Sequence, residues 1–151
     1  MIKPYDLTGY TKAKRWCGPS AVALLTGAPL AHTTARIAAM TGTPYAEVEG
    51  VWPEEAVLLL HELGYKAVPV DLVARYPDAP YGPTLKRYMA ERRTYDPWEE
   101  YHPTLIEVHG HLLCGHYGML FDNGTPKGAP VALFPKTGRL VKRAWIVTPL
   151  D

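Results

Sequence analysis

The chain has 151 residues, with 16 lysines and arginines against 15 aspartates and glutamates and a formal net charge of +1. This length suits one domain with a substantial core, so we predict a single domain over residues 1–151. The near-neutral charge and the lack of a basic stripe interleaved with aromatic residues argue against a nucleic-acid partner.

The sequence also argues against a membrane-spanning segment and against a disulfide framework. No apolar run reaches membrane-spanning length, and residues 1–6 lack the apolar core of a signal peptide. We therefore expect no membrane partner, and a cytoplasmic location or a place in a particle assembled in a cytoplasm. Cys17 and Cys114 are expected to remain free thiols. The oligomeric state stays open.

The first part of the chain is predicted to be mainly helical. Prolines in the first turn and glycine stops mark two of the helices. The predicted elements are helices from Cys17 to Gly27, over 31–40, from Pro53 to Gly64 and over 84–92, and one strand over 66–73.

Strand patterns dominate the rest of the chain, beyond an irregular stretch at 95–103. Short apolar runs bounded by glycine, proline and asparagine are typical of an antiparallel sheet. The predicted strands cover 104–109, 111–114, 119–122, 131–134 and 140–147. Helices followed by an antiparallel sheet define an α+β fold.

Cys17 is the first candidate catalytic residue. It stands at the start of an apolar helix, where unpaired backbone N–H groups and the positive end of the helix dipole favour a thiolate. Lys12, Lys14 and Arg15 add positive charge just upstream. The alternative is a small buried cysteine at a helix start. A catalytic role requires that the chain also supply a base and a group that orients it.

A predicted hairpin supplies both groups. Residues 115–118 are expected to form its loop, which places Cys114 opposite Met119 and His111 opposite Asp122. Directly opposed residues have Cβ atoms about 5 Å apart and project from the same face. We therefore predict that His111 is the general base and that Asp122 orients its ring.

His116 is the alternative base, because its surroundings also resemble the histidine motif of several thiol proteases. On one strand, His116 and Asp122 would be about 20 Å apart, at roughly 3.3 Å per residue. No other carboxylate or amide side chain follows Asn123 until Asp151. The register therefore favours His111.

A metal site is a further alternative, since His109, His111, Cys114 and His116 have the ligand chemistry of zinc. Strand alternation turns Cys114 away from His111, however, and His116 falls in the predicted loop. We therefore expect no metal and no other cofactor.

A Cys-Gly-Pro helix start at Cys17, a Gly-His strand at His111 and an Asp-Asn turn at Asp122 together resemble the papain-like cysteine peptidases. The likeness is nearest to the double-glycine-leader (bacteriocin-processing) peptidases and to small papain-like proteins of bacteriophages, and it covers residues 30–100 only in outline. It implies a phage-encoded papain-like domain, with N-terminal helices packed on a C-terminal antiparallel sheet. By this resemblance, Cys17, His111 and Asp122 would form a catalytic triad that cleaves a peptide or isopeptide bond of a peptide or protein substrate.

The chain departs from the family pattern at the oxyanion hole. Family members place a glutamine shortly before the cysteine, whereas this chain has Thr11 there and no glutamine at all. The backbone N–H of Cys17 can supply one donor, and the second would come from Thr8, Tyr10, Thr11, Lys12 or another backbone group. Loss of one such donor costs about 3 kcal/mol of transition-state stabilisation. The alternative function is a catalytically weak or inactive papain-like scaffold that acts as a binding or virion component.

Overall fold

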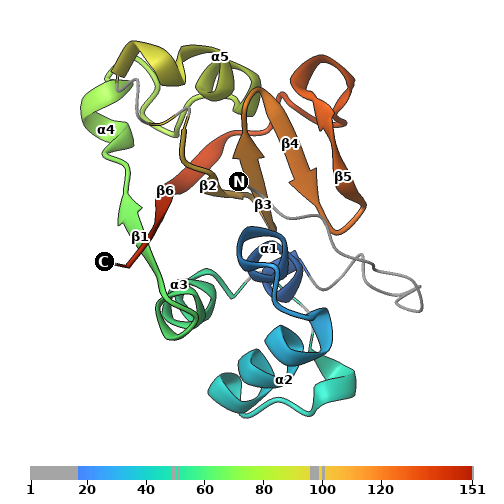
Figure 1. Ribbon diagram of the computed structural model, residues 1–151. Helices are drawn as coiled ribbons and strands as arrows, with labels where there is room; N and C mark the ends of the chain where they lie inside the picture. The colour runs from blue at the N-terminus through green and yellow to red at the C-terminus, as the bar shows by residue number, and fades with distance from the viewer. Residues whose placement is uncertain (1–16, 49, 51, 96–98, 100, 151) are drawn as a thin grey trace.

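The computed structural model describes residues 17–48, 50, 52–95, 99 and 101–150. Helices precede an antiparallel sheet along the chain, so the predicted α+β class is confirmed (Figure 1). The helices are α1 (Cys17–Thr26), α2 (Leu30–Thr41), α3 (Pro53–Glu62), α4 (Leu72–Arg75) and α5 (Leu85–Tyr95), with short 3-10 turns η2 (Tyr45–Glu47) and η4 (Val131–Leu133). None of these described helices is both long and apolar enough to cross a membrane.

Within the described residues, the strands form one six-stranded sheet in the order β1-β6-β2-β3-β4-β5. Every neighbouring pair in that order is antiparallel. The strands are β1 (Tyr65–Pro69), β2 (Thr104–Val108), β3 (His111–His116), β4 (Met119–Asp122), β5 (Thr125–Pro130) and β6 (Val141–Pro149). The strands β2 to β5 follow one another as a meander, and β6 returns to separate β2 from β1.

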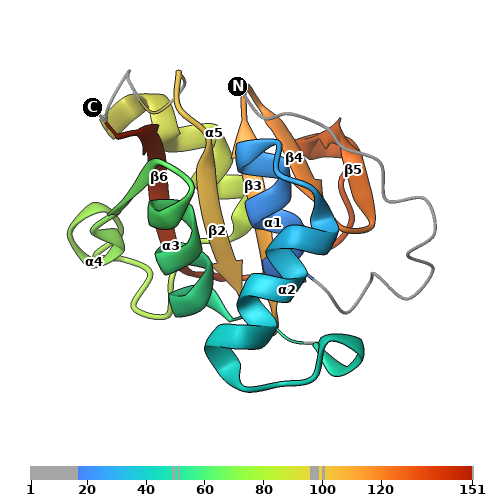
Figure 2. The ribbon, with the colours of Figure 1, turned by 60° about the horizontal axis from the view of Figure 1, so that its bottom comes forward.

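Helices cover both faces of the sheet, as Figure 2 shows. On one face α1 packs on β3 and β4, α3 packs on β1, and α2 packs on α1 and α3. On the other face α5 joins a second core cluster. Because alternate strand residues point to opposite faces, β3 sends Leu112 and Cys114 toward α1 and Leu113 toward α5. The central strands are therefore apolar on both sides, and each fully buried leucine contributes about 1.5–3 kcal/mol.

Two strand predictions are wrong in this sheet. The strand predicted over 66–73 ends at Pro69, and α4 begins at Leu72 because the Asp71 side chain accepts the Ala74 N–H at 3.1 Å and caps the helix. The strand predicted over 131–134 is the 3-10 turn η4 followed by a loop.

The strand that the sequence analysis missed is β5. It carries Pro126 and Pro130, which weaken any strand pattern and are tolerated because β5 lies at an edge of the sheet. It also contains Gly128 at φ 80°, where an added Cβ would lie 2.4 Å from the Phe121 ring. The glycine therefore lets the aromatic ring of β4 lie against the β5 backbone.

The predicted hairpin exists, but its register is wrong. Strand β3 continues to His116, and only Tyr117 and Gly118 form the turn, with φ of 51° and 72°. Two positive φ values match the two-residue turn that suits the twist of a hairpin. As a result, Cys114 lies opposite Phe121 rather than Met119, a shift of two residues along β4.

Candidate active site

Helix α1 places Cys17 at its first residue, as predicted. Pro19 occupies the first turn, and Gly27 ends the helix at φ 78°, where its N–H bonds the Ala23 carbonyl at 2.8 Å. The Cys17 side chain is 4% exposed, and its thiol donates to the Gly50 carbonyl at 3.3 Å. Cys17 therefore begins a helix, where the positive end of the helix dipole favours negative charge.

The hairpin brings the His111 ring and the Asp122 carboxylate into contact. His111 Nε2 lies 2.8 Å from Asp122 Oδ2, and both side chains are mostly buried. The Asp122 carboxylate is itself fixed, because its Oδ1 accepts the Gly124 N–H at 3.0 Å. This second bond is the Asx turn that an Asp-Asn-Gly sequence favours.

The contact survives the incorrect register for a geometric reason. A shift of two residues is even, so every side chain keeps its face of the sheet, whereas a shift of one would reverse all of them. His111 and Asp122 consequently meet as diagonal neighbours instead of directly opposed ones. His111 is also the first residue of β3, at the end of the sheet, where its ring comes within hydrogen-bonding reach of Cys17.

The electrostatics of the histidine depend on both neighbours. Burial lowers the pKa of His111, but its hydrogen bonds to Asp122 and Cys17 outweigh burial and raise the pKa to about 9. Burial raises the pKa of Asp122, and the hydrogen bond from His111 outweighs it, so the net shift is downward. The pair is therefore an imidazolium and a carboxylate at neutral pH, joined by a charge-assisted hydrogen bond.

His116, the alternative base, lies at the other end of β3 in different surroundings. It is 4% exposed, and burial lowers its pKa to about 4. Its ring packs on Tyr117, with centroids 4.2 Å apart. Within the described chain, His111 is bonded to the Asp122 carboxylate and reaches the Cys17 sulfur, whereas His116 lies at the opposite end of the strand.

The four candidate zinc ligands do not form one cluster. Cys114 is fully buried under α1, where its thiol donates to the Ala21 carbonyl at 3.6 Å and burial raises its pKa well above the usual range. His109 is exposed beyond the end of β2. In the part of the chain that the structure describes, no group of three or more metal-ligating side chains forms.

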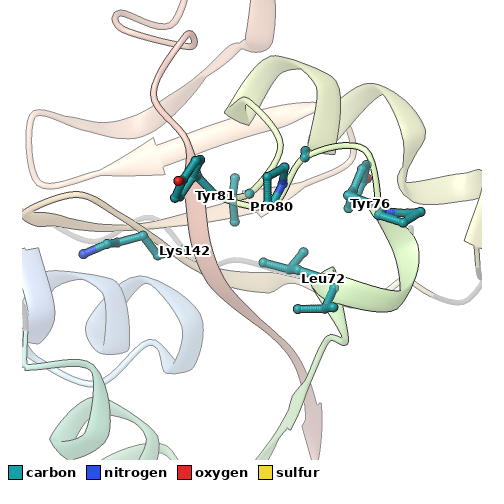
Figure 3. A pocket seen from close by; sticks show the side chains of 10 residues that line it. Leu72, Tyr76, Pro80, Tyr81 and Lys142 are labelled. Carbon is teal, nitrogen blue, oxygen red and sulfur yellow. The ribbon is translucent and has the colours of Figure 1, made fainter.

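A cavity of about 440 Å³ opens beside the histidine–carboxylate pair, and His111 and Asp122 both line it. A second cavity of similar volume lies between α4, the 77–82 turn and the start of β6, and its described lining holds no histidine, cysteine or carboxylate. Figure 3 shows Tyr76, Pro80 and Tyr81 along one side of it and Lys142 on another. Of these two cavities, the first is the one whose described lining includes histidines and a carboxylate.

Several predicted participants lie outside the described residues. These are the candidate oxyanion donors and upstream cations Thr8, Tyr10, Thr11, Lys12, Lys14 and Arg15. Sequence reasoning also missed groups that the structure places at the site. The Gly50 carbonyl, which accepts from Cys17, could not be predicted because any residue type can supply a backbone acceptor. Lys136 and Arg139 were missed because they reach the cavity from a loop that is distant in the sequence.

Comparison with known proteins adds no relative: no family model, no curated protein and no solved structure matches the chain.

Proposed function

We propose that this protein is a papain-like cysteine peptidase in which Cys17 is the nucleophile, His111 the general base and acid, and Asp122 the group that orients the ring. The observation that carries the proposal is the bond of 2.8 Å between His111 Nε2 and Asp122 Oδ2, on a ring that also reaches the Cys17 sulfur. A nucleophile, a base and an orienting carboxylate in that sequence of contacts are the parts that covalent acyl transfer needs.

The reaction follows from which ring nitrogen faces which partner. Because Nε2 is bonded to Asp122, Nδ1 is the nitrogen left to hold the proton taken from Cys17, so the reacting pair is a thiolate and an imidazolium. The thiolate then attacks the substrate carbonyl carbon, and the C–O π electrons move to oxygen. When this intermediate collapses, the C–N bond breaks and the amine leaves with the proton from His111 Nδ1. Water, deprotonated by His111, hydrolyses the thioester and regenerates the thiol.

The order of elements supports the papain-like assignment. The cysteine begins a buried helix of the N-terminal layer, and the histidine and carboxylate come from adjacent strands of the C-terminal sheet. By the resemblance to small phage-encoded members of that superfamily, the substrate is a peptide or isopeptide bond of a phage or host protein, or of a cell-wall peptide. The protein would then act in the host cytoplasm or within a virion.

The oxyanion hole of this peptidase differs from that of its proposed relatives. With no glutamine in the chain, the Cys17 N–H serves as one donor, and Thr8, Tyr10, Thr11, Lys12 or another backbone group serves as the other. If only one donor acts, turnover is about a hundredfold slower than in an enzyme with two.

The proposal is tested with a peptide library read by mass spectrometry and with a peptide-based thiol-directed inhibitor. Wild-type protein is expected to cleave library members and to carry one inhibitor on Cys17. Cys17→Ala should lose both, whereas Cys114→Ala should keep both because that thiol is buried against α1. Cleavage that persists in the Cys17→Ala variant would contradict the proposal.

A non-catalytic papain-like scaffold is the second candidate function. It is favoured by the low exposure of Cys17 and by its hydrogen bond to the Gly50 carbonyl, which together would also satisfy an inert thiol. Iodoacetamide separates the two candidates at pH 6. Rapid alkylation of Cys17 supports the peptidase, and a rate no faster than that of a free thiol supports the scaffold.

A further inference from the structure

The cavity beside His111 and Asp122 is lined by cations from a distant part of the chain. The turn after β2 and the end of β4 form one side, and the loop at 135–139 forms the other. From that loop Lys136 and Arg139 reach the cavity, while His109 contributes from the turn. Among the described residues of this lining, Asp122 is the only one with a carboxylate, and it is already bonded to His111.

Arg139 differs from other arginines of the described chain in having no carboxylate partner among the described residues. Four others form ion pairs with carboxylates, namely Arg36, Arg75, Arg87 and Arg143. The guanidinium of Arg139 instead donates from Nε to the Lys136 carbonyl at 3.1 Å, which holds it in the loop. Burial lowers the pKa of Arg139, opposed by the charge of Asp122. The cation is thus partly desolvated, fixed in place and not neutralised by a carboxylate of its own.

The backbone of the loop also fixes Lys136. Its φ is 60°, in the left-handed region that non-glycine residues seldom adopt. The conformation is held by the Arg139 N–H and Nε, both of which donate to the Lys136 carbonyl. The loop is tied to the rest of the fold through the Leu85 N–H, which donates to the Arg139 carbonyl at 2.8 Å. The loop backbone is therefore fixed, and the exposed Lys136 and the partly buried Arg139 line the same cavity as the histidine–carboxylate pair.

We infer that this cavity is a carboxylate-binding subsite that selects substrates with an acidic side chain or a C-terminal carboxylate next to the scissile bond. The inference rests on the proposed function, because it assigns the chemistry to His111 and its neighbours. A carboxylate entering here would form charge-assisted bonds to Lys136 and Arg139, and the bond to Arg139 would be strengthened by the partial desolvation of that guanidinium. Asp122 is shielded from the incoming anion by its own bond to His111.

The test uses small carboxylates and the resolved amide signals of Gly110 and Gly124, which both line the cavity. Acetyl-Glu-amide carries only a side-chain carboxylate, acetyl-Ala-Ala only a C-terminal carboxylate, and acetyl-Gln-amide neither. Saturable shifts of the two glycine signals with one or both anionic compounds, and none with the neutral one, support the subsite. Which anionic compound binds tells the two sources apart. Equal shifts with all three compounds would overturn the inference.

Variants locate the binding groups. Lys136→Asn removes the charge and suits a positive φ, and Arg139→Gln removes the other charge; each should weaken binding about tenfold, the loss of one charge-assisted bond. Arg139→Lys should retain most of the affinity, which controls for loop collapse. Lys127→Asn, an exposed position on β5 outside the cavity, is the matched control and should bind as wild type. Unchanged affinity in both Lys136→Asn and Arg139→Gln would refute the subsite.

Two separate measurements distinguish a wrong subsite assignment from a wrong proposed function. The carboxylate titration does not depend on the reactivity of Cys17, whereas iodoacetamide alkylation of wild-type protein reports that reactivity alone. Saturable binding with an inert Cys17 keeps the subsite and removes the peptidase. A reactive Cys17 without carboxylate binding does the reverse.

Discussion

The two ends of strand β3 carry the same side chain in opposite states. His111, at the first residue, is bonded to a carboxylate and has its pKa raised to about 9. His116, at the last residue, is buried and has its pKa lowered to about 4. Burial lowers the pKa of both rings, and at His111 the interactions with Asp122 and Cys17 reverse the sign of the net shift.

This contrast indicates how one strand can hold two histidines with opposite pKa shifts. An imidazole needs a partner for the positive charge that it gains when it takes a proton. At the His111 end the turn of β4 into β5 supplies Asp122, whereas at the His116 end the two-residue turn holds Tyr117. The difference between the two ends comes from the turns and not from the strand.

The largest expected effect separates the two histidines directly. His111→Ala should lower kcat/KM on a cleaved peptide by about 10²–10⁴-fold, the range for loss of a general base. His116→Asn should change it far less in protein that remains folded, because that ring is not bonded to Asp122. Steady-state kinetics on both variants, with circular dichroism as the folding control, measure this. Equal losses in the two variants would erase the distinction.

Asp122→Asn should have the next largest effect. The amide can still accept the Nε2–H, but the charge that helps to raise the His111 pKa is gone, so this pKa falls from about 9 toward 6.5. We expect kcat/KM to fall about tenfold to a hundredfold and the alkaline change in the pH profile to move to lower pH. Asp78→Asn, a carboxylate that pairs with Arg87, is the matched control and should leave the profile in place.

Gly128→Ala should weaken the strand that supports the Asp122 end. The new methyl group would lie 2.4 Å from the Phe121 ring, at a residue with φ 80°. We expect a loss of about 1–3 kcal/mol in the free energy of unfolding, measured by urea denaturation. Gly138→Ala is the control, since nothing lies within 4 Å of its added Cβ. Equal stability of the two variants would mean that the Phe121 contact gives way without cost.

The smallest effect is the opposite pH dependence of stability at the two ends. The pKa of His111 is higher in the folded chain, so its contribution is complete below pH 6.5 and is lost as pH rises toward 9. The pKa of His116 is lower in the folded chain, so its contribution is present above pH 6.5 and is lost as pH falls toward 4. The full pKa differences correspond to about 3 kcal/mol each, and screening by solvent reduces each change to the order of 1–2 kcal/mol.

We therefore measure the free energy of unfolding by urea denaturation from pH 4 to 9. Its dependence on pH should become flatter on the alkaline side in His111→Gln and on the acid side in His116→Gln. If either substitution flattened the pH profile of stability on both the acid and the alkaline side, His111 and His116 would not titrate independently.

Sequence alone predicted the parts of this site that depend on local pattern. Proline and glycine signals located the start of α1 at Cys17, and apolar alternation gave β4 with its correct bounds. His111 and Asp122 were paired correctly even though the turn was misassigned, because an error of two residues preserves the face of each side chain.

The parts that the sequence did not predict depend on long-range packing. Strand β5 was missed because its prolines are acceptable only at a sheet edge, which is a property of the assembled sheet. The Gly50 carbonyl lies 33 positions beyond Cys17 in the chain, and no residue type marks it as an acceptor. Lys136 and Arg139 follow a segment predicted as a strand, so their approach to His111 could not be derived.

The central claim is that Cys17, His111 and Asp122 act on one another, and an NMR titration of the histidine ring signals measures this most directly. We predict that His111 titrates near pH 9 in wild-type protein and at lower pH in both Cys17→Ser and Asp122→Asn, while His116 stays near 4 in all three. A His111 that titrates near 6.5 and does not respond to either substitution would contradict it.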